Sequence, residues 1–254
     1  MSVSKSYLDT MVERLQTMRD TQLDAINAAA QLCADTILGD NLVFTFGTGH
    51  GGFAALEMFP RTGTITGFRP IVDTPIALMH HVWGDMGTFQ YRFLHSRPGY
   101  GPVILKANRA RDGDALMLFS HSGINNVILD MALEFKEKGR KVVAITSIPH
   151  SSAVPSRHAS GRRLYEVADI VVDTGVPKED ASQFIEGLEH PVGPTSTSIA
   201  IAAGHAIVSA TTEEIVRRGK KPYIMVNTNT ATVEEAHRKN EENYEELWRL
   251  MCNR

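Results

Sequence analysis

Four apolar segments of the chain lack the alternation of polar and apolar residues that marks a half-exposed strand. They are 41–46 (NLVFTF), 114–120 (DALMLFS), 141–147 (KVVAITS) and 164–174, centred on 170–172. Strands that are apolar on both sides are typical of a parallel sheet covered by helices on both faces. A weaker strand is predicted at 68–73.

Segments with the apolar spacing of helices separate these strands, at 52–59, 125–139 and 195–219. The alternation predicts a doubly wound α/β fold. Helices at 4–38 and 232–251 flank it, and 222–228 is a candidate last strand. Because no repeat or low-complexity linker interrupts the chain, we expect one domain over 1–254. Its core would span about 40–215, followed by an extension at 220–254.

Composition excludes several classes of protein. The net charge is −3 and the basic clusters are short, so nothing indicates nucleic-acid binding. Cys33 and Cys252 lie far apart, and no spacing of cysteines and histidines suits a metal. The N-terminal residues lack the apolar stretch of a secretion signal, and no run approaches 18 apolar residues. We expect a soluble, cytoplasmic protein without a membrane partner, metal or cofactor.

Three polar loops stand at or near predicted strand ends and open helices. The residues that they contribute are Gly47, Thr48, Gly49 and His50; Ser120, His121, Ser122, Gly123 and Asn125; and Thr195, Ser196 and Thr197. Glycines let a ligand approach the backbone, and amides at a helix start attract anions. Each loop alone also fits an ordinary helix cap. Because ligands of open α/β sheets bind at the carboxyl ends of the strands, together they predict one shared anion site.

A dinucleotide site is an alternative for the first loop. Gly47, Gly49 and Gly52 satisfy the pattern G-x-G-x-x-G, and Asp73 ends the next strand where a ribose-binding acid would stand. The following helix is short before Pro60, however, and a dinucleotide leaves the other two loops unexplained. An NAD(P)-dependent dehydrogenase is therefore the weaker interpretation.

The segment 74–112 is a long insertion between two predicted strands, with one or two short helices expected. It is rich in aromatic residues and histidines, which indicates an ordered segment near a site or an interface. His80 and His81 are adjacent and cannot face the same side of a helix. His80 is our candidate for a ligand contact.

The order of these motifs resembles the sugar isomerase (SIS) domain family. The long first helix, FGTGHG, FSHSG, VVAITS and VADIVVD carry the resemblance over about 10–215, and HSSAVPSRHASGRRLYEVADIVVD and EGLEHPVGPTSTSIA resemble a stand-alone SIS subfamily. The resemblance implies a five-stranded sheet of flavodoxin-like order, a homodimer or homotetramer with sites at interfaces, and phosphosugar recognition by the serine loop. Asn125 stands where that loop usually has threonine. The family also includes sensor domains without catalysis.

Phosphoheptose isomerases are a more distant relation. The motif AAGHA places His205 at the position of their metal-binding catalytic histidine. Glu57, Arg61 and Thr197 stand where that family has histidine, an acid and glutamine. Because this set of zinc ligands is not reproduced, no metal is predicted.

The predicted function is aldose–ketose isomerisation of a phosphorylated or otherwise anionic sugar, such as a sulfonate, through a cis-enediol. This reaction needs a base and a proton shuttle. Glu57 lies in the apolar context AALEMF, where burial would raise the pKa of its carboxyl group. The other candidates are His205, Glu186, Glu189 and His190, the last three just before the third loop. A sugar-phosphate-binding module without catalysis remains the alternative.

Overall fold

The computed structural model describes residues 2–77, 87–230 and 232–252. Five parallel strands form one sheet in the order β2-β1-β3-β4-β5. They are β1 (Val43–Gly47), β2 (Phe68–Pro70), β3 (Ala115–Ser120), β4 (Lys141–Thr146) and β5 (Ile170–Asp173). The predicted doubly wound sheet of flavodoxin-like order is confirmed.

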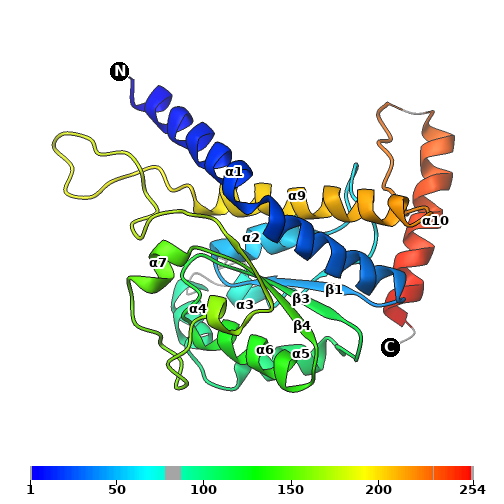
Figure 1. Ribbon diagram of the computed structural model, residues 1–254, viewed down its shortest axis with the longest axis horizontal. Coiled ribbons are helices and arrows are strands. Elements are labelled where there is room, and N and C mark those ends of the chain that lie inside the picture. The colour runs from blue at the N-terminus through cyan, green and yellow to red at the C-terminus, as the bar shows by residue number, and fades with distance from the viewer. Residues whose placement is uncertain (1, 78–86, 231, 253–254) are drawn as a thin grey trace.

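Helices cover both faces of the sheet (Figure 1). One face carries α1 (Val3–Leu38), α2 (His50–Glu57) and α9 (Ser196–Arg217). The other carries α3 (Thr74–Ala77), α4 (Gly87–His95), α5 (Tyr100–Ala107) and α6 (Asn126–Glu137). Two short helices, α7 (Ile148–Ser152) and α8 (Leu164–Val167), flank the segment between β4 and β5, and α10 (Val233–Cys252) ends the described chain.

Each face of the sheet buries its own apolar cluster. Phe119 and Met58 pack with the α1, α2 and α9 side chains, whereas Phe44, Phe46 and Phe135 pack with those of α5 and α6. This division explains why the strand segments are apolar on both sides. By length and composition, α9 could cross a membrane. Its apolar side chains are accounted for by packing, because the helix contacts α1 and α2.

The carboxyl ends of the strands meet at one edge of the sheet. In the register, Gly47 of β1 pairs with Phe119, Ser120 with Thr146, and Thr146 with Asp173. The helices α2, α6 and α9 all begin at this edge, on the left of Figure 1. The three polar loops therefore converge.

The segment 222–228 does not extend the sheet. Its contact is an isolated antiparallel bridge between Ile224 and Ile65, with hydrogen bonds to the loop before β2. The side chain of Asn240 on α10 accepts from the backbone of Val226 and donates to it (2.8 and 3.0 Å). The segment thus meets a loop and a helix in place of a strand edge, which is why the candidate last strand is absent from the described sheet.

Asp180 ties the loop between β5 and α9 to the start of α9. Its Oδ1 accepts from the backbone amides of Thr195 (2.8 Å) and Ser196 (2.7 Å), and its Oδ2 accepts from the Ser196 hydroxyl (2.7 Å). Burial would raise the pKa of Asp180, but these hydrogen bonds outweigh burial and lower it. The residue has φ of 59°, a left-handed conformation that non-glycine residues rarely adopt.

Phe135→Ala should destabilise the protein by about 3–5 kcal/mol, because the ring is fully buried and its removal leaves a cavity. The matched control is Phe89→Ala, at a residue that is 65% exposed, and its effect should stay within about 0.5 kcal/mol. Urea denaturation measures both. Equal losses would contradict this assignment of the core.

Asp180→Asn should cost about 1–2 kcal/mol at pH 7, because the charged acceptor at the helix start is lost. A carboxyl group whose folded pKa is lowered stabilises above its unfolded pKa of about 3.9 and loses that contribution as pH falls through the folded value. The difference from wild type should therefore persist at pH 5–7 and shrink in more acidic buffer. Urea denaturation across this range tests it, with exposed Glu179→Gln as the control. A pH-independent difference would contradict the ionic role.

Candidate functional site

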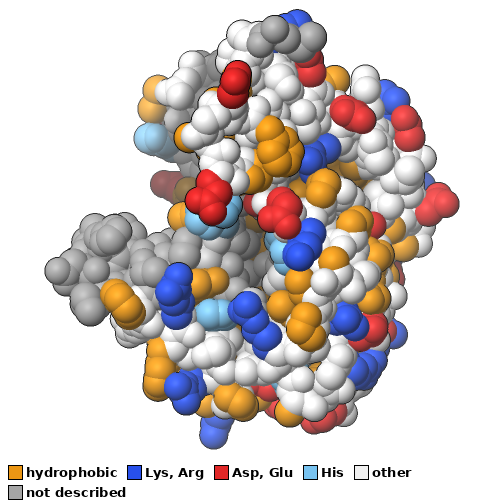
Figure 2. Space-filling view, turned by 90° about the vertical axis from the view of Figure 1, so that its left-hand side faces the viewer, with side chains coloured by type: hydrophobic (Ala, Val, Ile, Leu, Met, Phe, Trp, Pro, Cys, Tyr) orange, Lys and Arg blue, Asp and Glu red, His pale blue; other side chains and the backbone are white. Residues whose placement is uncertain are grey.

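A cavity of about 480 Å³ opens where the polar loops converge. Figure 2 views this end of the molecule and shows a hollowed face with acidic, basic and histidine side chains around the hollow. The predicted residues that line the cavity are Thr48, His50, Ser120, His121, Ser122, Asn125, Ser196 and Thr197. Gly47, Gly49, Gly123 and Thr195 belong to the same turns but are not among the residues that line the cavity. His80 lies outside the described residues.

The start of α6 is open toward a ligand. Its N-cap residue Asn125 makes no side-chain hydrogen bond to the helix, and the first-turn amides of a helix have no acceptor within it. The Ser120 hydroxyl accepts from the Gly123 amide (3.1 Å), which folds the serine loop around this helix start. The uncapped helix start and the two serine residues therefore lie at one end of the cavity, an arrangement suited to an anion.

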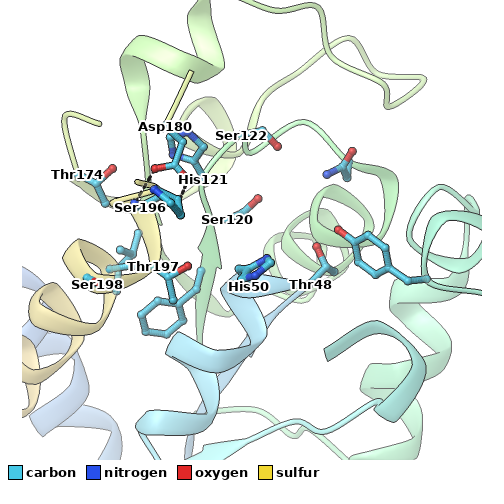
Figure 3. A pocket seen from close by; sticks show the side chains of 17 residues that line it. Thr48, His50, Ser120, His121, Ser122, Thr174, Asp180, Ser196, Thr197 and Ser198 are labelled. Carbon is cyan, nitrogen blue, oxygen red and sulfur yellow. Dashed lines mark hydrogen bonds between the residues drawn. The ribbon is translucent and has the colours of Figure 1, made fainter. Parts of the chain in front are cut away.

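The start of α9 is already occupied by an anion of the protein itself. Asp180 accepts hydrogen bonds from the backbone amides of Thr195 and Ser196. These amides are therefore not free to bind an anionic ligand, which the third loop was expected to do. Asp180, Ser196 and Thr197 are seen together at one side of the pocket in Figure 3. This end of the cavity therefore offers hydroxyl groups of Thr197 and Ser198 in place of helix amides.

The glycines of the first loop serve packing as much as ligand access. A Cβ atom on Gly51 would lie 2.4 Å from the Phe119 carbonyl oxygen, and one on Gly47 would lie 2.3 Å from the Gly51 backbone. Gly49 has φ of 59°, which favours glycine. These positions let α2 begin directly against the sheet, so that His50 and Ser120 lie beside one cavity (Figure 3).

His121 lines the cavity as a neutral imidazole. Burial and the neighbouring His150 ring, 4.4 Å away between centroids, lower the pKa of His121 to about 4. Both ring nitrogens are enclosed, and the Pro177 backbone is near enough to oppose the lowering of the pKa without forming a well-aligned hydrogen bond. The Thr174 hydroxyl and Nε and Nη1 of Arg14 are likewise enclosed without a hydrogen-bond partner among the described residues. A neutral imidazole can donate or accept a hydrogen bond but is a weak base at this pKa.

Glu57 and His205 form a pair outside the lining of this cavity. His205 Nε2 lies 3.2 Å from Glu57 Oε1, and Arg61 forms a salt bridge with the same oxygen. Burial would raise the pKa of Glu57, but the hydrogen bonds from Arg61 and His205 outweigh it and lower the pKa. The expectation of a raised pKa was wrong, because the sequence context AALEMF does not contain the two hydrogen-bond partners, Arg61 and His205.

This pair is also a poor metal site. Two potential ligands are short of the three that a catalytic zinc ion takes from protein, and Arg61 competes for the carboxylate. Within 2–77, 87–230 and 232–252, no three histidine, cysteine or acidic side chains are grouped to hold a metal ion.

Glu186, Glu189 and His190 lie on a projecting arm, which we define as residues 181–193. A bridge between Gln183 and Val192 closes the arm, and all three candidates are exposed and do not line the cavity of their own chain. Phe184 is 83% exposed on the same arm. In Figure 1 the arm extends away from the sheet.

Several residues at the site were not among the predicted ones. Asp180, Thr174, Ser198 and Tyr91 line the cavity. Tyr91 contacts the Thr48 side chain, and burial raises the pKa of its phenol. The aromatic residues of the insertion 74–112 indicated that a residue such as Tyr91 could lie near the site. No sequence motif surrounds Asp180, so nothing in the sequence indicated its place there. Asp73, the ribose candidate, lies outside the lining and accepts a hydrogen bond from Tyr100 (2.7 Å).

Known relatives share most of the chain. A UPF0309 protein of Shouchella clausii is 32% identical over 229 residues, 90% of this chain and 91% of its own length. One of Oceanobacillus iheyensis is 35% identical over 208 residues, 82% of each chain.

Solved structures share the fold. Phosphoheptose isomerase of Francisella tularensis has a TM-score of 0.55 at 15% identity, with 82% of this chain and 96% of that chain covered. The NanR protein of Vibrio vulnificus, complexed with ManNAc-6P, has a TM-score of 0.50 at 12% identity, with 86% and 65% covered. The family model of the SIS domain matches residues 6–147, more than half of the sequence. The chain therefore belongs to the SIS-domain family.

Proposed function

We propose that this protein binds a phosphosugar and catalyses its aldose–ketose isomerisation. The observation that carries the proposal is the uncapped start of α6, which opens with Ser120, Ser122 and Asn125 into a cavity also lined by His50. The volume of about 480 Å³ is in the range of small-molecule sites. The fold neighbours support the ligand class, since one is an isomerase of a phosphosugar and another is complexed with ManNAc-6P.

In this proposal the phosphate binds at the serine loop, where amides and hydroxyls donate to its oxygens. The sugar then extends between His50 and the hydroxyls of Thr197 and Ser198. His50 is the exposed imidazole of the lining and serves as the proton shuttle on the sugar oxygens.

The isomerisation also needs a base that removes a proton from carbon. Among the described residues that line the cavity, no carboxylate is free to act as that base. Asp180 is the carboxylate of that lining among the described residues, and its oxygens are bonded to the start of α9. We therefore assign the base to Glu186 or Glu189 on the arm of a second copy, with His190 beside them.

A homodimer follows from this assignment. The exposed apolar side chains of α1, Leu8, Val12, Leu15 and Leu23, recur at helical spacing, and Phe184 and Leu188 are exposed on the arm. These surfaces would pack against another copy of the chain. We further infer that 1–254 form one domain, and that it works in the cytoplasm.

Binding without catalysis is the second candidate function. It is favoured by the same shortage of a free carboxylate, because Glu57 and His205 are paired with each other outside the cavity lining. In that case the protein would sense a sugar phosphate and pass the signal through its exposed helices.

The isomerase should exchange a proton at C1 or C2 of its substrate for deuterium. The protein is incubated in D2O with a panel of aldose and ketose phosphates and read by proton NMR, with sugar sulfonates alongside. His50→Gln should lower the exchange rate by about 10²–10⁴-fold, as expected for loss of an acid–base group. Glu57→Gln, outside the cavity lining, is the comparison and should have a smaller effect. Absence of exchange with every sugar, together with saturable binding, would leave the sensor function.

Ser122→Ala should weaken sugar-phosphate binding about tenfold or more, because a hydroxyl bonded to a charged group contributes about 1.5–3 kcal/mol. Isothermal titration calorimetry measures the change. Ser152→Ala is the matched control, since that hydroxyl bonds the Ile148 carbonyl on the exposed surface of α7. If both variants bind like wild type, the phosphate does not lie at the serine loop.

A further inference from the structure

The motif HSSAVPSRHASGRR, left without a role by the sequence, forms a clamp on the outer side of the serine loop. The clamp is defined as residues 150–164, which are the motif and the leucine that follows it. The Ser151 hydroxyl donates to the Ser122 carbonyl (2.6 Å), and the Leu164 amide donates to the Gly123 carbonyl (2.8 Å). Between them, the Arg157 amide donates to the Ile124 carbonyl (3.1 Å). Three successive carbonyls of the serine loop are thus held by one segment.

The clamp is also ordered within itself. The Ser156 hydroxyl donates to the Arg162 carbonyl (2.7 Å), and Arg163 Nε donates to the Ser151 carbonyl (2.7 Å). His158 Nε2 lies 3.0 Å from an Asp130 carboxylate oxygen on α6. The backbone at Arg157 is therefore fixed from both sides, which reduces the entropy lost when its side chain binds a ligand.

The Arg157 side chain borders the anion end of the cavity. Its Nη1 donates to Asn125 Oδ1 (3.0 Å), and its charge is close enough to act on the Tyr91 phenol. Asn125 and Tyr91 both line the cavity. A guanidinium has five N–H donors. Among the described residues, the hydrogen bond of the Arg157 side chain is the one from Nη1 to Asn125. Most of the donor fork remains available to a ligand.

Positive charge is otherwise scarce at this end. Within the parts of the chain that the structure describes, no lysine or arginine lines the cavity. The helix dipole supplies about half an elementary charge, whereas a phosphate monoester carries about −1.5 to −2 at pH 7. A planar guanidinium matches two phosphate oxygens at once.

We propose that Arg157 is the residue that makes this site specific for a phosphate dianion, and that Asn125 positions its guanidinium. The inference rests on the proposed phosphosugar site and adds the group that selects its anion. It also gives Asn125 a reason to replace threonine: its carbonyl oxygen holds Arg157 and leaves the start of α6 uncapped.

Binding of inorganic phosphate and of a sugar phosphate is measured by calorimetry in wild type, Arg157→Ala, Arg157→Lys and Arg162→Ala. Arg162 is the matched control, because it lies on the same clamp and bonds the Glu166 carbonyl. Arg157→Ala should weaken both ligands at least tenfold, and Arg157→Lys should recover part of the loss. Arg162→Ala should bind like wild type. Asn125→Ala should fall between wild type and Arg157→Ala.

Two readouts separate this role from simple support of the fold. Wild-type affinity should rise between about pH 5 and 7.5 as phosphate loses its second proton near pH 6, and this rise should flatten in Arg157→Ala. The dependence of affinity on salt should weaken in the same variant. Thermal melting confirms that each variant is folded.

Equal phosphate affinity in Arg157→Ala and Arg162→Ala would overturn the inference, as would a wild-type protein that binds no phosphate. The outcome for the proposed isomerase is separate. If binding depends on Arg157 but no sugar phosphate is turned over, the isomerase fails and the Arg157 assignment stands. If sugar phosphates are turned over with unchanged KM in Arg157→Ala, the isomerase stands and the Arg157 assignment fails.

Discussion

The close approach of α2 to the sheet is the constraint on which the site depends. Without side chains on Gly47 and Gly51, the first turn of α2 lies against the ends of β1 and β3, where a Cβ would meet backbone atoms at 2.3–2.4 Å. Backbone cannot move aside as a flexible side chain can, so this packing fixes where Thr48 and His50 lie relative to the serine loop. The glycine pattern is thus a requirement of helix–sheet packing first, and the resemblance to a dinucleotide fingerprint follows from that shared need.

Three helix starts converge on the cavity, but they are electrostatically unequal. Asp180 neutralises the start of α9, whereas the start of α6 keeps its amides and has Arg157 beside it. An anionic group would therefore be drawn to α6 and repelled from the Asp180 end. A ligand with one phosphate and a neutral polyol chain suits this asymmetry better than one charged at both ends.

The sequence was sufficient for features that depend on local patterns. Apolar runs without alternation predicted the strands, and polar residues after them predicted a shared pocket, because parallel topology brings strand ends together. Features that depend on distant partners were not readable. Asp180 lies in a segment without periodicity, Arg157 reaches Asn125 across 32 positions, and Glu57 meets His205 across 148. The direction of the Glu57 pKa was mispredicted for two reasons: the prediction left out Arg61, one helical turn away, and His205 is a distant partner.

The geometry of α2 also bears on where carbon chemistry can occur. His50 begins this helix and Glu57 ends it, and seven residues at 1.5 Å each separate them by about 10 Å. A sugar anchored at the start of α6 and passing His50 would have to run along α2 to reach Glu57, whose carboxylate is already bonded to Arg61 and His205. The arm carries exposed carboxylates and exposed apolar side chains, and it extends away from the sheet. If the base comes from that arm, the active site is completed only by assembly, and a monomer would bind the sugar phosphate without converting it.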